Sequence, residues 1–598
     1  MEKLALNNAS PERYWLGVWP ILITLVCWTI VICLSVVATR PIAPLPETIP
    51  ADQFSATRAD KILELLVGDG IPHPAGSEQN RIVRARIVNL LKSYGYQVEV
   101  QHGMRTVDER AKDRSPDKDE IDLYNIIATR TNGQQSKATA NRKLIMLAAH
   151  YDSVPFGPGA CDDAVGTAAL LEIARMLAND SATKHDLIFL ISDAEEFGLL
   201  GAKHFVKHHP LADQVDLVIN VEARGTTGPS IMFETSRMSR SLIPIFASTS
   251  RRPFASSLFY EIYKRQPNDT DFSVFREHGM LGYNFAFIGD VRNYHTPADN
   301  FQNADRGSMQ HHGENVLGLV RAIVDSDELD WLGGRKAGTS DEAVYFDLFG
   351  KWILWWPSSW SLGMSLAAIL LCLIATRRFH QTENQLPGIG ERQFSTEGFW
   401  WNLNILVFVI ICVVAAGCLL HRFIQQDPRF SNPWPLQPVP ILFAYWLTGF
   451  AITGGLAIAC SKWLTPLGAW SAFLFIWCLL AVVTSIRFSG GSHLFVVPIL
   501  STSIFAAVVC RLGIRGFIWT VIFAAIAVGL MWLQLERLFY DAVGFKMPLA
   551  MMIRISMAST ALLVLLSATN SRTRFAFSIS MSVGAVIALV AATILNTE

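Results

Sequence analysis

Two apolar regions enclose a polar one in this chain, and that division constrains the fold more than any other feature. Residues 16–38 and nearly all residues after 350 are apolar, whereas residues 51–345 have the mixed composition of a water-soluble domain. Only 17% of the 598 residues are charged, compared with about 25% in soluble domains. Because about 20 apolar residues cross a bilayer, we expect a membrane protein with one soluble domain.

The first apolar run, from Trp15 to Ala38, contains no charged residue. It is longer than the core of a signal peptide, so it predicts an uncleaved anchor, with cleavage near Ser35 to Ala38 as the alternative. Eight further runs reach membrane-spanning length, near residues 352–376, 400–420, 438–460, 466–486, 492–510, 515–535, 549–568 and 575–596. We therefore expect an all-α bundle of about nine transmembrane helices.

The resulting layout has six parts. They are a cytoplasmic tail at 1–15, an anchor at 16–38, a linker at 39–55, a soluble domain at 56–330, a linker at 331–350 and a transmembrane domain at 351–598.

Lysine and arginine are unevenly distributed between the two sets of predicted loops. With the N-terminus in the cytoplasm, the cytoplasmic segments carry Lys3, Arg13, Arg377, Arg378, Arg392, Lys462, Arg511, Arg515, Arg572 and Arg574. The opposite short loops carry Arg422, Arg429, Arg487, Arg537 and Lys546. The positive-inside rule then places the soluble domain outside the cytoplasm.

The predicted spans contain almost no ionisable side chain in their interiors. Arg554 is the exception, and its position near one end of a span predicts that it snorkels to water. Transporters and proton pumps need such groups inside the membrane, so the sequence disfavours a channel or transporter.

The soluble region alternates helical patterns with short apolar runs, as α/β proteins do. Helices are expected at 59–67, 80–94 and 165–178, and loops at 104–120 and 131–142. The apolar runs at 144–149, 187–191 and 217–221 predict buried strands, and a fourth apolar run covers 283–288.

Residue types that bind metals follow each of the three predicted strands. His150 and Asp152 end the first, Glu195 and Glu196 follow the second, and Glu222 follows the third. The carboxyl ends of parallel strands converge at one edge of a sheet, which would bring these residues together.

Three further candidates lie in turns, namely Asp162 and Asp163 before a helix and His295 beyond the last apolar run. Singly, a histidine could be a core residue, a Glu pair a solvated turn and an Asp pair a helix cap. Their joint occurrence favours a metal site.

Four segments in order, AAHYDSVPFGPGACDDAVGTAALLEIAR, SDAEEFGLLGA, NVEARG and NYHTPADN, closely resemble the co-catalytic di-zinc aminopeptidases of metallopeptidase family twenty-eight. The nine-helix layout is similar to the membrane branch of that family. The resemblance covers about residues 55–330 and implies a three-layer α/β/α domain with a central mixed, largely parallel sheet.

The resemblance also implies two zinc ions. His150, Asp162 and Glu222 would hold one, while Asp162, Glu196 and His295 would hold the other, so that Asp162 bridges them. Imidazole nitrogen and carboxylate oxygen are ligands that zinc takes.

Three more roles follow from the same resemblance. Glu195 would be the general base that takes a proton from the attacking water, and Asp152 would orient His150 through the ring nitrogen remote from zinc. Tyr294 would stabilise the oxyanion. Apart from the resemblance, Cys161 beside Asp162 is expected to be a small residue packed under the site, with a reactive thiol or a minor metal ligand as the alternative.

The expected function is removal of N-terminal residues from peptides by a membrane-bound enzyme. One alternative is glutaminyl cyclase activity with a single zinc, which the complete set of five ligands disfavours. Another is a non-catalytic receptor or scaffold, which the presence of Glu195 disfavours.

Nucleic acid is not an expected partner, because the formal net charge is −1 and no basic patch with interleaved aromatic residues occurs. The expected partners are peptides and the lipid membrane, and the oligomeric state stays open, a homodimer included. Eukaryotic members of the branch usually carry a further soluble domain after the last span, so the end at Glu598 favours a bacterial inner membrane over an endoplasmic reticulum or vacuolar membrane.

Overall fold

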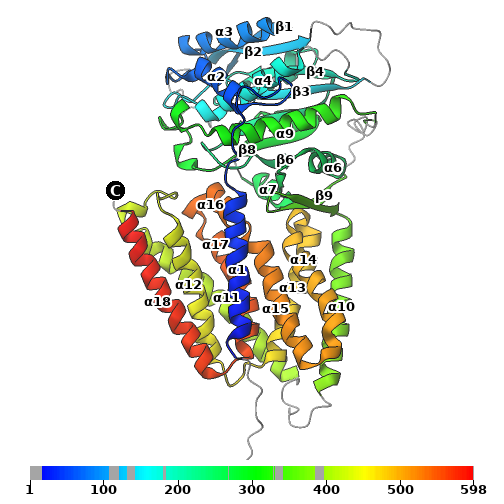
Figure 1. Cartoon of the computed structure of the whole chain (residues 1–598), viewed down its shortest axis with the longest axis vertical. Coiled ribbons are helices and arrows are strands. Elements are labelled where there is room, and N and C mark those ends of the chain that lie inside the picture. Colours follow the sequence, from blue (N-terminus) through cyan, green and yellow to red (C-terminus); the bar gives the residue numbers. More distant parts are fainter. Residues whose placement is uncertain are drawn as a thin grey trace, which may run out of the picture. The chain divides into compact units, whose positions relative to one another are not determined.

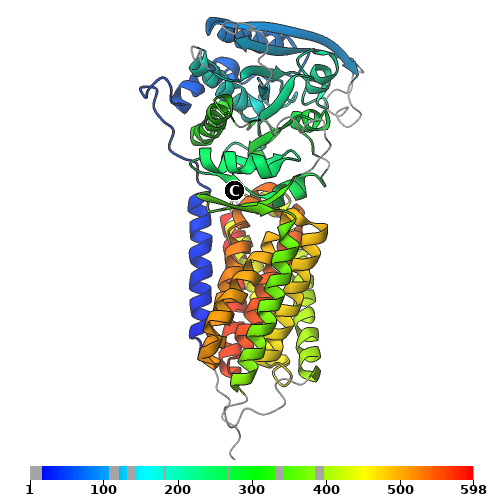
Figure 2. The same ribbon diagram turned by 90° about the vertical axis from the view of Figure 1, so that its right-hand side faces the viewer.

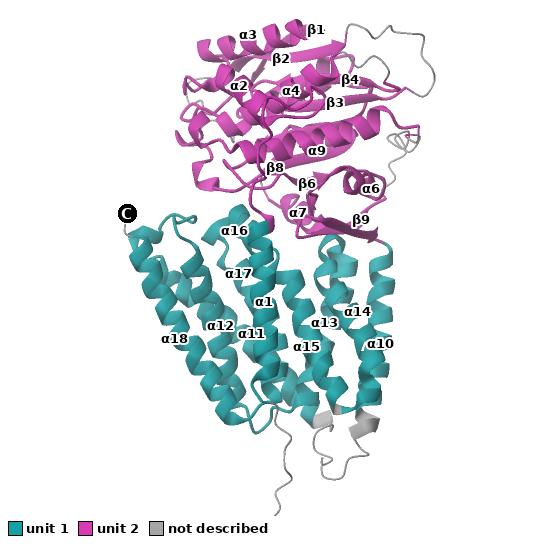
Figure 3. Ribbon diagram, in the orientation of Figure 1, with its two compact units in different colours: residues 1–37, 359–598 teal, residues 38–358 magenta. Residues whose placement is uncertain are grey.

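The computed structural model describes residues 17–106, 120–130, 142–178, 183–266, 268–327, 329, 341–383 and 396–596. The expected tail at 1–15 and most of the two expected loops lie outside these residues. The chain divides into two compact units, one formed by residues 1–37 and 359–598 and the other by residues 38–358 (Figure 3).

An eight-stranded mixed sheet forms the centre of the second unit, in the order β1-β2-β4-β3-β5-β8-β6-β7. The strands are β1 (Tyr96–Thr106), β2 (Glu120–Arg130), β3 (Leu144–His150), β4 (Asp186–Ser192), β5 (Val215–Ala223), β6 (Ile231–Thr235), β7 (Phe254–Ala255) and β8 (Leu281–Phe287). The four central strands β4, β3, β5 and β8 are parallel to one another, whereas β1, β2 and β6 run antiparallel to their neighbours and β7 pairs parallel with β6. The expected largely parallel mixed sheet is confirmed.

Eight α-helices accompany this sheet in the described residues, some of them visible in Figure 1. They are α2 (Ala56–Val67), α3 (Glu78–Ser93), α4 (Gly166–Leu177), α5 (Leu200–His208), α6 (Ser239–Thr249), α7 (Ser257–Tyr263), α8 (Asp271–Glu277) and α9 (Arg306–Val324). The hydroxyl of Ser77 accepts the Asn80 N–H and caps α3, and Asp305 does the same for α9 with Ser308. Such caps satisfy backbone donors at helix starts.

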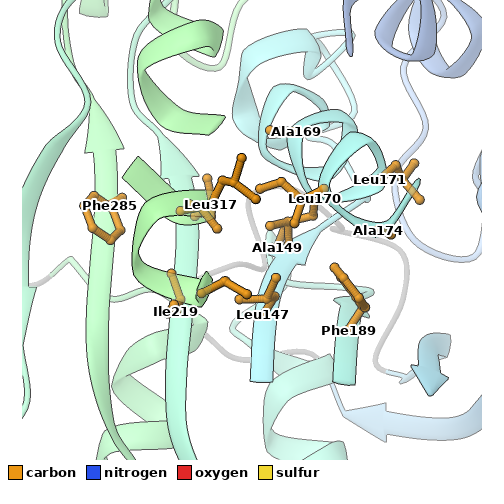
Figure 4. Packing of buried hydrophobic residues seen from close by; sticks show 14 of the residues in the cluster. Leu147, Ala149, Ala169, Leu170, Leu171, Ala174, Phe189, Ile219, Phe285 and Leu317 are labelled. Atoms are coloured by element: carbon orange, nitrogen blue, oxygen red, sulfur yellow. The ribbon is translucent and has the colours of Figure 1, made fainter. Parts of the chain in front are cut away.

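Alternate residues of the central strands bury two opposite faces of the sheet. Leu147 and Ala149 of β3 pack against α4, as Figure 4 shows for Leu170 and Leu171, and Leu317 of α9 lies in the same cluster. Met146 and Ala148 belong to a second cluster that includes residues of α5 and α8, among them Phe205, Phe272 and Phe275. Because side chains alternate along a strand, the continuous apolar runs give the predicted three-layer α/β/α arrangement.

A two-stranded hairpin of β9 (Ala343–Leu348) and β10 (Trp352–Pro357) corrects two of the expected boundaries. The linker expected at 331–350 contains β9, and the span expected to begin at 352 begins with β10 instead. Tyr345 is buried in the core of the second unit, while Trp352 and Leu354 are exposed. Hydropathy alone places this aromatic strand in the following helix, because both are apolar.

The first unit is a bundle of helices, seen from two sides in Figures 1 and 2. Nine helical segments of the described chain are long and apolar enough to cross a membrane. They comprise α1 (Trp19–Ala38), α10 (Trp360–Glu383), α11 (Thr396–Ile424), α12 (Val439–Ala459), α13 (Pro466–Arg487), α14 (His493–Val509), α15 (Ile514–Leu533) with α16 (Glu536–Val543), α17 (Pro548–Ser567) and α18 (Ser571–Leu595). The chain is a multi-pass membrane protein.

Helix α1 packs against α15. The Trp28 indole N–H donates to the Ala525 carbonyl, and the Ser35 hydroxyl donates to the Gln534 carbonyl. Helix α17 is buried along most of its length, so the bundle is built around it.

Two arginines of the bundle differ from expectation. Arg554 does not snorkel to water, since it is only 3% exposed and its Nη1 lies 3.2 Å from a carboxylate oxygen of Glu536. Arg574, expected in a cytoplasmic segment, is also buried and donates to the carbonyls of Leu566, Ser567 and Ala457. Carbonyl groups near helix ends therefore compensate Arg574, whereas a carboxylate on another helix compensates Arg554.

Candidate metal centre

The candidate residues gather at the carboxyl ends of the central parallel strands. His150 ends β3, Glu195 and Glu196 follow β4, and Glu222 lies near the end of β5. Two further segments complete the group, namely the kinked π-helical segment Ala160–Val165 with Asp162 and the loop after β8 with His295. The edge expected from the strand pattern is therefore the edge where these residues meet.

Two groups of three side chains could each hold a metal ion, and Asp162 belongs to both. In the first, His150 Nε2 lies 3.3 Å from Asp162 Oδ1 and 3.5 Å from Glu222 Oε2. In the second, His295 Nε2 lies 3.0 Å from Asp162 Oδ2 and 3.0 Å from Glu196 Oε1. The two oxygens of one carboxylate thus face the two groups separately.

Several of the candidate ligand atoms have no hydrogen-bond partner, as expected for atoms that bind a metal ion. The Nε2 atoms of His150 and His295 and the Oδ2 atom of Asp162 are buried without a hydrogen-bond partner. Buried polar atoms in this condition are rare and call for a missing ligand. Two imidazoles and three carboxylates are a donor set that zinc accepts.

The electrostatics of the site point to bound positive charge. Burial alone would lower the pKa of His150, but the carboxylates of Asp152, Asp162 and Glu222 outweigh it and raise that pKa. Burial likewise opposes protonation of His295, yet Glu196 and Asp162 raise its pKa to about 9. A divalent cation would supply the same compensation while leaving both rings neutral as ligands.

Asp152 links the histidine to the glutamate pair. Its backbone carbonyl lies 3.1 Å from His150 Nδ1 and its carboxylate oxygen lies 3.4 Å from that nitrogen. The same carboxylate accepts the backbone N–H groups of Glu195 and Glu196. The His150 ring is therefore contacted by both the carbonyl and the carboxylate of Asp152. Sequence reasoning predicted this contact but missed the hydrogen bonds from the carboxylate to the Glu195–Glu196 backbone.

Glu195 is half-buried and lies near enough to His150, Glu222 and Glu196 for their charges to affect it. Burial raises its pKa well above the usual range, and the charges of Glu222 and Glu196 raise it further, whereas His150 lowers it. Its position beside Glu196 agrees with one residue of the pair facing the ions and the other remaining available for proton transfer.

Tyr294 lies against the second group. Its ring stacks on His295 with centroids 3.7 Å apart, and its pKa is raised first by burial and then by the charges of Asp162 and Glu196. His295 adopts a left-handed backbone with φ of 56°, a conformation that costs energy for residues other than glycine. Such strain is characteristic of functional positions.

Asp163 does not join either metal group. Its carboxylate accepts the backbone N–H groups of His150 and Gly166, so the capping interpretation holds for this member of the pair. Cys161 is buried, and burial raises its thiol pKa well above the usual range, which leaves it a packed, protonated side chain.

Sequence reasoning missed two buried aspartates near the site. The carboxylate of Asp299 accepts the backbone N–H of Cys161 at 2.7 Å and that of Asp162 at 3.2 Å. The carboxylate of Asp271 accepts the Ser192 hydroxyl and leaves its other oxygen without a partner. Asp299 lies in the NYHTPADN segment, which was considered only for Tyr294 and His295. Asp271 follows no strand, so no sequence pattern marked it as a candidate.

The structure thus combines an α/β unit that carries a candidate metal centre with the helices of a multi-pass membrane protein. Residues 125–320 match Peptidase family M28. The resemblance inferred from the four sequence segments is confirmed.

Three similar proteins illustrate the match. The human endoplasmic reticulum metallopeptidase 1 is 30% identical over 60% of this chain and 41% of its own length. A vacuolar membrane protease of Eremothecium gossypii is 30% identical over 52% of this chain and 31% of its own length. The chain therefore spans less than half of these relatives. A solved aminopeptidase from Aneurinibacillus sp. strain AM-1 aligns with a TM-score of 0.38 and 17% identity, over 47% of this chain and 96% of that one.

Proposed function

We propose that the chain is a two-zinc aminopeptidase that removes N-terminal residues from peptides. His150, Asp162 and Glu222 would hold one ion, and Asp162, Glu196 and His295 the other. The observation that carries the proposal is the position of Asp162, whose Oδ1 faces His150 and whose Oδ2 faces His295. A carboxylate placed in this way can bridge two ions.

These residues would hold zinc, which when bound would supply Lewis-acid activation of the scissile carbonyl and of a water molecule. Glu195 would accept a proton from the attacking water and deliver it to the leaving amine. Burial raises the pKa of Glu195, so the surroundings favour the protonated form that it would adopt after accepting this proton.

Two neighbouring residues would prepare the site for this reaction. The Tyr294 hydroxyl would donate to the oxyanion that forms from the carbonyl. Asp152 would hold His150 and the Glu195–Glu196 backbone in one arrangement through the contacts described above. Proton transfer requires such fixed geometry, because donor and acceptor must be within hydrogen-bond reach.

Metal analysis together with turnover of aminoacyl substrates tests the proposal. We expect two zinc ions per purified chain, and turnover that falls at least about 10²-fold in Glu195→Gln, the lower range for a general base. The exposed Glu64 provides a matched control, since Glu64→Gln should keep full activity. One zinc per chain, or undiminished activity of Glu195→Gln, would overturn the mechanism.

Peptides with an acetylated N-terminus separate an aminopeptidase from other peptidases. The proposed enzyme requires a free α-amine, so acetylation should abolish cleavage of an otherwise good substrate. Cleavage of the acetylated peptide at an internal bond would support a metallopeptidase of different specificity.

The proposed orientation places the peptidase domain outside the cytoplasm, by the distribution of lysine and arginine between the loops. A bacterial inner membrane is the proposed location, with the endoplasmic reticulum or vacuole as the alternative. Protease accessibility of the domain in sealed membrane vesicles checks the orientation.

A further inference from the structure

A pair of histidines on α5 lies apart from the metal centre and has no part in the proposed reaction. His204 and His208 are four residues apart, so they lie on the same face of the helix. Their ring centroids are 4.7 Å apart with an angle of 37° between the planes. Two histidines at this spacing on a helix are an arrangement that binds zinc in other proteins.

The distance between the rings suits a shared ion. With metal–nitrogen bonds of about 2.0–2.1 Å, two imidazoles on one ion hold their centroids roughly 4.5–5.2 Å apart for bond angles between square and tetrahedral. The observed separation falls inside this interval, so the rings need little movement to chelate.

The His204 ring is held in place by the neighbouring sheet. It lies against Gly103 of β1, where a side-chain carbon would come within 2.3 Å of the ring. Only glycine gives the ring this space. The Nδ1 atom of His204 is buried without a hydrogen-bond partner, and a buried polar atom in this condition needs an explanation such as a missing ligand.

Both rings are available as neutral ligands. Burial and the positive charge of Arg105 lower the pKa of His204, and the same influences lower the pKa of His208. Metal ions bind the neutral imidazole. The adjacent His209 faces elsewhere, since it stacks on Phe205 and its Nε2 lies 3.4 Å from Glu99.

We propose that His204 and His208 form a surface site for a late first-row divalent transition metal ion, such as Zn²⁺ or Cu²⁺. In the described part of the chain no third histidine, cysteine or carboxylate completes a tight group here, so water fills the remaining positions. Arg105 and Lys207 nearby repel a cation, and the site is therefore weaker than the buried centre.

Copper titration of the full-length, zinc-loaded chain tests this site. Electron paramagnetic resonance should show one Cu²⁺ per chain with nitrogen ligands, while zinc content and peptidase turnover stay constant. His208→Gln and His204→Gln should each abolish that signal without lowering turnover. His278→Gln, which changes a histidine at the end of α8, is the matched control and should retain it.

Comparison of His208→Gln with His204→Gln distinguishes loss of the copper site from misfolding. His208 is exposed, so its replacement leaves the fold intact even where the His204 variant is destabilised. An unchanged copper signal in His208→Gln, or the absence of a nitrogen-ligated copper in the wild type, would overturn the proposal.

Discussion

The carboxylate of Asp152 accepts the backbone N–H of Glu195 at 3.0 Å. The neighbouring N–H of Glu196 donates to its other oxygen at 3.2 Å. Asp152, which follows β3, therefore fixes the turn after β4 that carries the proposed general base Glu195 and the proposed metal ligand Glu196. The two strands are adjacent and parallel, so their ends lie close enough for this contact.

Replacing Asp152 by asparagine should weaken metal binding. The asparagine amide has one acceptor oxygen, whereas the Asp152 carboxylate has two. One of the backbone N–H groups of Glu195 and Glu196 therefore loses its acceptor and faces an NH₂ group. Residues that support metal ligands typically change affinity or activity by about 10–100-fold. Zinc retention against a competing chelator measures the effect. The exposed Asp52 supplies the control, and equal retention in Asp152→Asn and Asp52→Asn would contradict the expectation.

Asp299 should support the proposed bridging ligand, Asp162, in a comparable way. Its two oxygens accept the N–H groups of Cys161 and Asp162, and burial raises its pKa to about 7, with the charge of Asp162 adding to this. Asp299→Asn should lower zinc affinity about 10-fold or more, as read from zinc content after dialysis against a chelator.

Cys161→Ala is the matched control for Asp299. It removes the thiol but keeps the backbone N–H that Asp299 binds, so zinc content should equal that of the wild type. Loss of zinc from Cys161→Ala would instead show that the thiol itself supports the site.

The convergence of the candidate ligands could be predicted from the sequence because several of them end or follow strands. A buried parallel strand is a continuous apolar run, and its carboxyl end is where sites form, so the position of His150, Glu196 and Glu222 can be inferred from residue order. Asp299 and Asp271 act through contacts between loops that are distant in sequence. No local pattern reports such contacts, and only the fold reveals them.

The membrane region was predictable as helices but not in its details. Length and hydropathy gave the spans, whereas the β10 strand was included in one of them because Trp352–Pro357 is apolar. The buried state of Arg554 was also missed, because its partner Glu536 lies on a different helix. Partner choice inside a bundle depends on packing and not on sequence spacing.

Acid should destabilise the peptidase unit through the buried His311. Its Nδ1 accepts the Ser230 N–H and its Nε2 donates to the Arg252 carbonyl, so the ring is neutral. Burial lowers its pKa to about 3, below the value of about 6.5 in an unfolded chain. Between these two pKa values the unfolded chain protonates His311 and the folded chain does not, which favours unfolding. The contribution of the neutral ring to stability is therefore full above pH 6.5 and declines as the pH falls.

The slope reaches about 1.4 kcal/mol per pH unit for one such group. His311→Gln can replace both hydrogen bonds and cannot take up a proton, so its melting temperature should fall less than that of the wild type between pH 7 and pH 5. Thermal unfolding of the purified chain at several pH values measures this. If the melting temperatures of the two proteins fall equally with pH, His311 does not contribute to the loss of stability in acid.

The buried pair of Arg554 and Glu536 should respond differently to single and double replacement. The Arg554 guanidinium also lies over the ring of Phe539, 4.4 Å from its centroid, and the side chain is only 4% exposed. Arg554→Met leaves the Glu536 carboxylate buried without its cation, which costs about 3–5 kcal/mol for pairs of this kind. Adding Glu536→Gln removes the uncompensated charge and should restore most of the stability.

Thermal unfolding in detergent compares the single and the double variant, with Arg572→Met as an exposed control on α18. If the double variant is no more stable than Arg554→Met alone, the pair does not act as a charge-compensating unit, and the stacking of Arg554 on Phe539 accounts for its burial instead.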